Sequence, residues 1–147
     1  MPKDSLLVAP QYDQAGKLIK VEKSRADWKK QLTADEFYIL REQGTERAGS
    51  GDLLNEHSHG VFVCAGCGLP LFGSEAKFES GTGWPSFFQP LDAKYVQVAT
   101  DNTLGMSRDE VACARCGGHL GHVFNDGPKP TGLRYCMDSG AMNFVKQ

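Results

Sequence analysis

Two short segments near the N-terminus show the spacing of hydrophobic residues that is typical of amphipathic helices. Ser24 is a suitable N-cap, Asp27 falls in the first turn, and Trp28 and Leu32 then lie four residues apart on one face. A first helix is therefore expected to begin after Ser24. Residues 1–23 carry no such pattern and predict an extended lead-in, followed by a single domain over residues 24–147.

A second helix is predicted directly after the first. Residues 33–36 read Thr-Ala-Asp-Glu and match a capping box, and Phe37, Ile39 and Leu40 then supply an apolar side. Gly44 is the expected C-terminal stop. Because apolar helix faces usually pack against a core, we interpret these side chains as core residues.

After a polar loop over residues 45–60, the pattern changes to short hydrophobic segments bounded by turn residues. This spacing predicts antiparallel strands, not alternating strand and helix units. The expected fold is mainly β, of the α+β class, with antiparallel β-sheets in a sandwich- or barrel-like core and short N-terminal helices. The segments expected to form strands are Val61–Val63, Lys77–Phe78, Tyr95–Ala99, Glu110–Ala112, Val123–Phe124, Leu133–Tyr135 and Ala141–Val145.

Length and charge narrow the possible classes of protein. The chain has 147 residues, enough for one domain, and its 16 Lys and Arg against 18 Asp and Glu give a net charge of −2. That balance supplies no basic surface for nucleic acid. The hydrophobic runs are too short for a membrane span or a signal-peptide core. We therefore expect a cytoplasmic protein that binds neither nucleic acid nor membranes, with a monomer as the default state.

Four of the five cysteines form two C-x-x-C pairs, Cys64 with Cys67 and Cys113 with Cys116. Each pair follows a predicted strand and continues into a glycine, which lets the backbone turn so that both sulfurs face one ion. Four thiolates complete a tetrahedral zinc site, so the metal is expected to be structural. The alternative, a pair of redox-active dithiols, lacks the strand and helix context that a thioredoxin-like motif needs.

The fifth cysteine, Cys136, has no partner in the sequence. A lone cysteine is more often an inert buried residue than a nucleophile. However, Arg134 lies two residues away on the same face of a predicted strand, where its charge stabilises a thiolate, while Tyr135 points to the other face. His119 and His122 lie in a glycine-rich segment that predicts a loop or bend. Either imidazole has the spacing to join the zinc site, but four cysteines already satisfy the metal, so we favour both as hydrogen-bonding or proton-donating groups.

A rigid aromatic loop is predicted over residues 81–88, which read Gly-Thr-Gly-Trp-Pro-Ser-Phe-Phe. Trp84, held by the following proline, is suited to form the wall of a pocket for an apolar substrate group such as a methyl. The alternative for each aromatic residue is core packing, which we favour for Phe87 and Phe88 when the residues are considered alone.

Taken together, these motifs resemble those of the methionine-R-sulfoxide reductases of the B type. The resemblance covers roughly residues 25–145 and rests on four motifs in the same order as in that family: Cys64-Ala-Gly-Cys67, the Gly-Trp-Pro-Ser-Phe loop, the segment from Cys113 to Phe124, and Arg134-Tyr-Cys136. It implies a structural zinc remote from the active site, and reduction of the R epimer of methionine sulfoxide, free or in proteins.

The resemblance also assigns roles to individual residues. Cys136 would be the nucleophile that becomes a sulfenic acid. His119, His122, Asp126, Arg134 and Asp138 would complete the catalytic group, with Arg134 favouring the thiolate. The residues expected to contact the substrate are Trp84, Phe87 and Phe124.

Two positions depart from the family pattern. Many members carry a resolving cysteine where this chain has Thr82, so we expect regeneration by an external thiol, such as thioredoxin. Asp138 stands where asparagine is usual. An ionised carboxylate there would raise the pKa of Cys136; alternatively, Asp138 is protonated, or it turns towards Arg134.

Two other functions are compatible with part of the sequence. A zinc-ribbon interaction module without catalysis explains the four metal cysteines but not Cys136, the histidines or the Trp84 loop. A cysteine hydrolase would need an oxyanion hole and an acyl pocket, and no motif marks either. We therefore favour the reductase.

Overall fold

The structure is a computed structural model that describes residues 7–101 and 108–147. Helix α1 (Arg25–Gln31) is capped by Ser24, whose side chain accepts a hydrogen bond from the Asp27 N–H. Helix α2 (Ala34–Glu42) begins with both hydrogen bonds of the predicted capping box. It ends one residue earlier than expected, because Gln43 and not Gly44 takes the left-handed conformation, with φ 56°.

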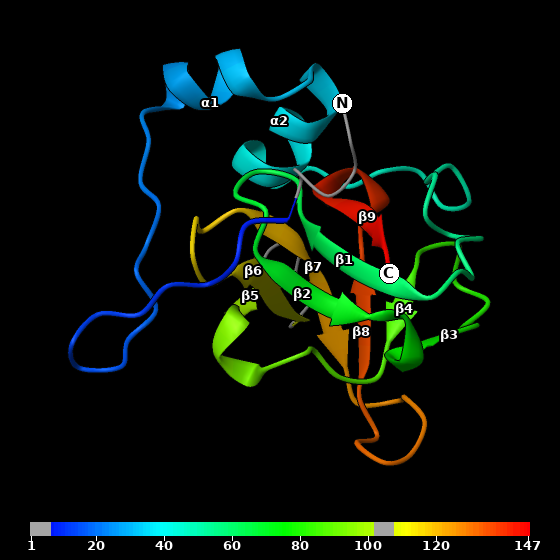
Figure 1. The fold of residues 1–147 in the computed structure, drawn as a ribbon. Coiled ribbons are helices and arrows are strands. Elements are labelled where there is room, and N and C mark those ends of the chain that lie inside the picture. Colours follow the sequence, from blue (N-terminus) through cyan, green and yellow to red (C-terminus); the bar gives the residue numbers. More distant parts are fainter. Residues whose placement is uncertain (1–6, 102–107) are drawn as a thin grey trace.

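The strands form two antiparallel sheets, as the sequence predicted. A three-stranded sheet has the order β2-β1-β9, and a six-stranded sheet has the order β3-β4-β8-β7-β6-β5 (Figure 1). Their bounds are β1 Gly60–Cys64, β2 Pro70–Gly73, β3 Lys77–Phe78, β4 Ser86–Phe87, β5 Val96–Asp101, β6 Arg108–Cys113, β7 His119–Phe124, β8 Arg134–Met137 and β9 Met142–Lys146. The helices lie over one end of the sheets (Figure 1).

The sequence did not reveal two of these strands, β2 and β4. Turn residues lie at both segments, Pro70 and Gly73 in β2 and Pro85 before β4, and in a sequence such residues indicate a loop. Strand β4 nevertheless matters for the site, because it pairs with β8 and places Ser86 directly opposite Cys136.

Aromatic side chains join the two sheets in the core. Phe87 of β4 stacks on Phe72 of β2, with ring centroids 4.4 Å apart, and meets the edge of Phe62 of β1 at 5.0 Å. All three side chains are fully buried. Tyr135 of β8 lies 5.7 Å from the Phe72 ring, on the face of β8 opposite to Cys136, as predicted.

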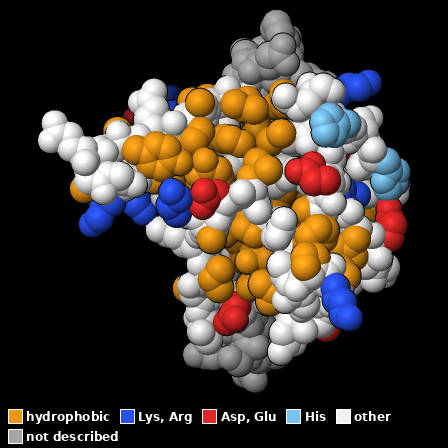
Figure 2. All heavy atoms as spheres, turned by 60° about the horizontal axis from the view of Figure 1, so that its bottom comes forward, with side chains coloured by type: hydrophobic (Ala, Val, Ile, Leu, Met, Phe, Trp, Pro, Cys, Tyr) orange, Lys and Arg blue, Asp and Glu red, His pale blue; other side chains and the backbone are white. Residues whose placement is uncertain are grey.

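Residues 7–23 run along the side of the molecule (Figure 1); residues 1–6 of the predicted lead-in lie outside the described part of the chain. On the face seen in Figure 2, hydrophobic side chains are interspersed with acidic and basic ones. Among the described residues, no helix has the length and apolar character required to cross a membrane.

Candidate active site and metal centre

The two cysteine pairs meet at one point between the sheets. Cys64 ends β1 and Cys113 ends β6, and each turn closes through a glycine with φ 77°, Gly68 or Gly117. The four sulfurs all lie within 4.8 Å of one another. Cys64 Sγ is 3.6 Å from Cys116 Sγ, and Cys67 Sγ is 3.5 Å from Cys113 Sγ.

This arrangement fits a tetrahedral zinc ion. With Zn–S bonds of about 2.3 Å, the sulfurs of such a site lie about 3.8 Å apart. Contact with Cys113 raises the pKa of Cys64 and lowers that of Cys67. A divalent cation would hold all four as thiolates. The group contains no histidine, in agreement with the four-cysteine interpretation.

Arg115, inside the second C-x-x-C pair, ties the lead-in to the first pair. Its buried guanidinium donates hydrogen bonds to the carbonyl oxygens of Val8, Ala9 and Cys67, at 2.7, 2.9 and 2.8 Å. The lead-in is therefore anchored beside the cysteine group.

A separate pocket surrounds Cys136 and has a volume of about 280 Å³. Its floor comes from β7 and β8, whose register places His122 opposite Cys136 and Phe124 opposite Arg134. None of the four cysteines of the candidate zinc site lines this pocket. The lining residues are Thr45, Thr82, Trp84, Gly121, His122, Phe124, Arg134, Cys136 and Asp138.

The two histidines lie in strand β7, so of the two predicted alternatives, a loop or a bend, the loop was wrong and the irregularity is a bulge within the strand. The register between β6 and β7 shifts there: Val111 pairs with Gly121, but Ala112 pairs with His119, which leaves Leu120 as an extra residue. Such a bulge reverses the alternation of side chains. His119 and His122 therefore share one face despite a spacing of three, with ring centroids 5.4 Å apart.

His119 is buried behind the pocket, between two carboxyl groups. Its Nδ1 lies 2.7 Å from Glu110 Oε2, and its Nε2 lies 4.0 Å from Asp138 Oδ2. The Glu110 contact orients the ring. His122, in contrast, reaches the pocket directly.

Arg134 projects to the same face as Cys136, as predicted. It pairs with Asp126 through two hydrogen bonds, Nε–Oδ1 at 2.9 Å and Nη2–Oδ2 at 3.2 Å. Its guanidinium also lies 4.3 Å from the centroid of the Phe124 ring. The bidentate pair lowers the pKa of Asp126 and holds the positive charge at the pocket wall.

Opposing effects act on the Cys136 thiol. Burial raises its pKa, and the charge of Asp138 adds to this, whereas hydrogen bonds with Thr82 and Ser86 and the charge of Arg134 lower it. Burial also raises the pKa of Asp138 to about 7. Asp138 does not turn towards Arg134, because its Oδ1 accepts a hydrogen bond from the Glu46 N–H at 3.1 Å. Near neutral pH, Asp138 is thus present in both protonation states.

Replacing Asp138 with asparagine is expected to lower the pKa of Cys136 by up to about one unit, because the change removes a nearby negative charge. The rate of alkylation of Cys136 as a function of pH measures this shift. An unchanged pH profile of alkylation would mean that Asp138 has no electrostatic effect on the Cys136 thiol.

The same variant also changes the pH dependence of stability. The folded pKa of Asp138, about 7, exceeds its usual value of 3.8, so the fold prefers the neutral carboxyl. This contribution is complete below about pH 4 and lost as the pH rises through about 7. The asparagine variant should therefore gain stability relative to the wild type over this range.

Trp84 forms a wall of the pocket and is held from outside by the loop after α2. Its Nε1–H donates to the backbone oxygen of Glu46 at 3.1 Å. The N–H of Glu46 donates a hydrogen bond to Asp138. Glu46 therefore connects Trp84 on one side of the pocket with Asp138 on the other.

Comparison with known proteins identifies the family. The model of the SelR domain matches residues 32–146. The chain belongs to the SelR domain family. It is 53% identical over 128 residues to a protein of Leptospira interrogans, covering 87% of this chain and 98% of the relative. It is 55% identical to a protein of Thiobacillus denitrificans, covering 83% and 92% of the two chains. Both relatives are named peptide methionine sulfoxide reductase MsrB.

One predicted substrate contact of this SelR protein was wrong. Phe87 does not line the pocket, because β4 turns its side chain to the opposite face from Ser86, into the aromatic core. The core interpretation, which the residues alone favoured, is correct for Phe87. Phe124 does line the pocket.

Two alanine variants separate these positions. Phe87→Ala is expected to lower the free energy of unfolding by about 3–4 kcal/mol, because it empties a fully buried site. Phe124→Ala, at the pocket, should change stability much less but raise KM. Thermal unfolding and steady-state kinetics measure both effects. Equal destabilisation by the two variants would contradict the assignment.

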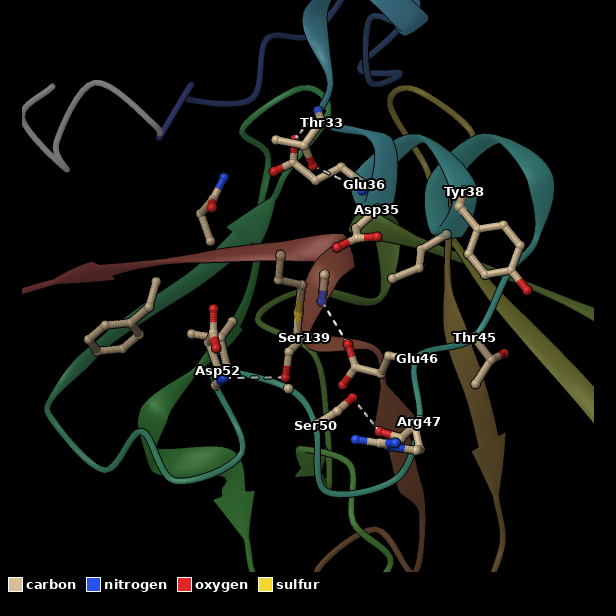
Figure 3. Close-up of a pocket in the computed structure, with 17 residues that line it drawn as sticks. Thr33, Asp35, Glu36, Tyr38, Thr45, Glu46, Arg47, Ser50, Asp52 and Ser139 are labelled. Carbon is tan, nitrogen blue, oxygen red and sulfur yellow. Dashed lines mark hydrogen bonds between the residues drawn. The ribbon is translucent and has the colours of Figure 1, made fainter.

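Glu46 and Glu110 of the SelR site were not recognisable from sequence motifs. Glu46 lies in a polar loop without a motif, and Glu110 is recognisable only from the pairing of β6 with β7. Glu46 also borders a second pocket of about 610 Å³ between α2, the following loop and residues 139–144 (Figure 3). There, its Oε1 accepts a hydrogen bond from the Gly140 N–H at 2.9 Å, which fixes the loop.

Proposed function

We propose that this protein reduces the R epimer of methionine sulfoxide in oxidised proteins to methionine, with Cys136 as the nucleophile. The chain is an oxidoreductase of the peptide-methionine (R)-S-oxide reductase class, in keeping with its family and relatives. The observation that best supports the role of Cys136 is its position in an aromatic-walled pocket beside the charge of Arg134. We further propose that residues 24–147 form the catalytic unit.

In the proposed reaction, the Cys136 thiolate attacks the sulfoxide sulfur while a proton is delivered to the oxygen. The oxygen passes to Cys136, the S–O bond of the substrate breaks, and methionine leaves. The thiolate, one proton and the sulfoxide thus become a sulfenic acid and a thioether, so Cys136 is oxidised by two electrons and the substrate is reduced by two.

The surrounding residues would act on this step in different ways. Arg134, fixed by Asp126, favours the thiolate. His122 reaches the pocket and is suited to deliver the proton. The buried His119 ring packs against the His122 ring and would hold it in position. Trp84 and Phe124 would contact the methyl group and side-chain carbons of the substrate, and Trp84 should contribute to the choice of epimer.

The cysteine group would hold one zinc ion. Its four thiolates leave no open coordination position, so zinc would stabilise the two turns and contribute no redox chemistry. Regeneration would use an external thiol, thioredoxin being the favoured candidate. The thiol displaces water from the sulfenic acid to give a mixed disulfide, and a second thiol releases Cys136.

Trapping with a sulfenic-acid probe tests this cycle. After one turnover without reductant, we expect a single probe adduct on Cys136, because Thr82 supplies no thiol to capture the intermediate. Mass spectrometry locates the adduct. An internal disulfide that accumulates in its place would contradict regeneration by an external thiol.

A further inference from the structure

Three hydroxyl groups connect the sulfur of Cys136 with the buried interior of the six-stranded sheet. Thr82 Oγ1 lies 3.8 Å from Cys136 Sγ and 2.8 Å from Ser80 Oγ. Ser80 Oγ lies 2.7 Å from Ser86 Oγ, whose hydroxyl in turn donates to the Trp84 carbonyl oxygen at 3.3 Å. These contacts form a chain from the sulfur to a backbone acceptor, and the Ser86 hydroxyl also forms a hydrogen bond with Cys136 directly.

The inner end of this chain is shielded from water. Ser86 is fully buried, and the pairing of β4 with β8 places it directly opposite Cys136. Hydrogen bonds in such surroundings are electrostatically stronger than at the surface, and each polarises the next. The chain can therefore affect the charge on the sulfur more than exposed hydroxyls would.

The direction of the hydrogen bonds depends on the state of Cys136. With a neutral thiol, every donor can point inward: S–H to Thr82, Thr82 to Ser80, Ser80 to Ser86, and Ser86 to the backbone. With a thiolate, only the Thr82 hydroxyl has to rotate, so that it donates to sulfur. Ser80 keeps its hydrogen bond to Ser86, and its oxygen still faces the Thr82 N–H at 3.4 Å.

We propose that Thr82 is a catalytic residue that donates a hydrogen bond to the Cys136 thiolate, and that Ser80, held by Ser86, is a positioning residue that keeps Thr82 in place. This inference rests on the proposed function, in which Cys136 is the nucleophile. It gives position 82 a role of its own: the hydroxyl activates the attacking sulfur, although it forms no disulfide afterwards.

The ionisable groups around Cys136 are the same in every variant of this chain of hydroxyls. Arg134 and Asp138 lie on either side of Cys136 in sequence, and His122 faces it from β7. A change in the titration of Cys136 after removal of a hydroxyl therefore reports the hydrogen bond and not a lost charge.

The test is the pH profile of Cys136 alkylation by iodoacetamide in the full-length, zinc-loaded protein, followed by mass spectrometry. Thr82→Val, which keeps the shape and removes the hydroxyl, should raise the apparent pKa of Cys136 by about one unit. Below that pKa, alkylation becomes about tenfold slower. Thr82→Ser should restore the wild-type profile, and Ser80→Ala, which removes the link between Thr82 and Ser86, should give a smaller shift in the same direction.

Thr45→Val is the matched control, because Thr45 lines the same pocket without belonging to the hydroxyl chain. It should leave the thiol titration unchanged. Thr82→Ala replaces the valine variant if the latter fails to fold. An unchanged titration in Thr82→Val, or an equal shift in Thr45→Val, would overturn the proposal. Because alkylation needs no turnover, this result is independent of whether the protein reduces the sulfoxide.

Discussion

Cys136→Ser is expected to reduce turnover on the order of 10³-fold or more, because a serine hydroxyl is not ionised at neutral pH and is a poor nucleophile towards a sulfoxide sulfur. The loss should appear in kcat, since the pocket walls formed by Trp84 and Phe124 remain. Steady-state reduction of a blocked methionine sulfoxide with dithiothreitol as reductant measures it.

Two properties should stay unchanged in this variant. The cysteines that would hold zinc do not line the Cys136 pocket, so the metal content and the unfolding temperature should match the wild type. Residual turnover within tenfold of the wild type would show that another group attacks the substrate.

Cys113→Ser is expected to have the largest effect on stability. Zinc binding to structural cysteine sites contributes on the order of 10 kcal/mol, whereas a whole domain is stable by only about 5–15 kcal/mol. Cys113 ends β6 and, through its sulfur contact with Cys67, connects that strand to the turn after β1. Loss of this ligand should release the metal. Most of the cooperative unfolding transition should then be lost.

Thermal unfolding and a metal assay on purified Cys113→Ser measure both effects, and Cys136→Ser is the matched control because it also replaces one cysteine. Chelation of the wild type should reproduce the result. A Cys113→Ser protein with one zinc per chain and an unchanged unfolding temperature would contradict a structural role for the metal.

Local patterns were sufficient to predict much of the fold. The capping residues located both helices, and the glycines after Cys67 and Cys116 predicted turns that the structure shows with positive φ. Cysteine spacing predicted the four-sulfur group, because the ligands of each pair are close in sequence. The caps and turns depend on interactions within a few residues, whereas the four-sulfur group also joins two pairs that are distant in sequence and was predictable because one zinc ion needs four thiolates.

Features that depend on the pairing of distant strands were not predictable. The bulge at Leu120 brings two histidines to one face, but it exists only in the register between β6 and β7. The orientation of Phe87 likewise follows from the pairing of β4, a strand of 2 residues without a pattern of its own. The hydrogen bonds of Glu46 to Trp84 and Asp138 connect segments separated by 38 and 92 residues.

The proposed activity is the reduction of the R epimer of methionine sulfoxide. The most direct test supplies the separate R and S sulfoxides of a blocked methionine to the zinc-loaded wild type, with dithiothreitol as reductant. We expect the R epimer to be converted to the thioether while the S epimer remains. Conversion of the S epimer, or of neither epimer by folded protein, would contradict it.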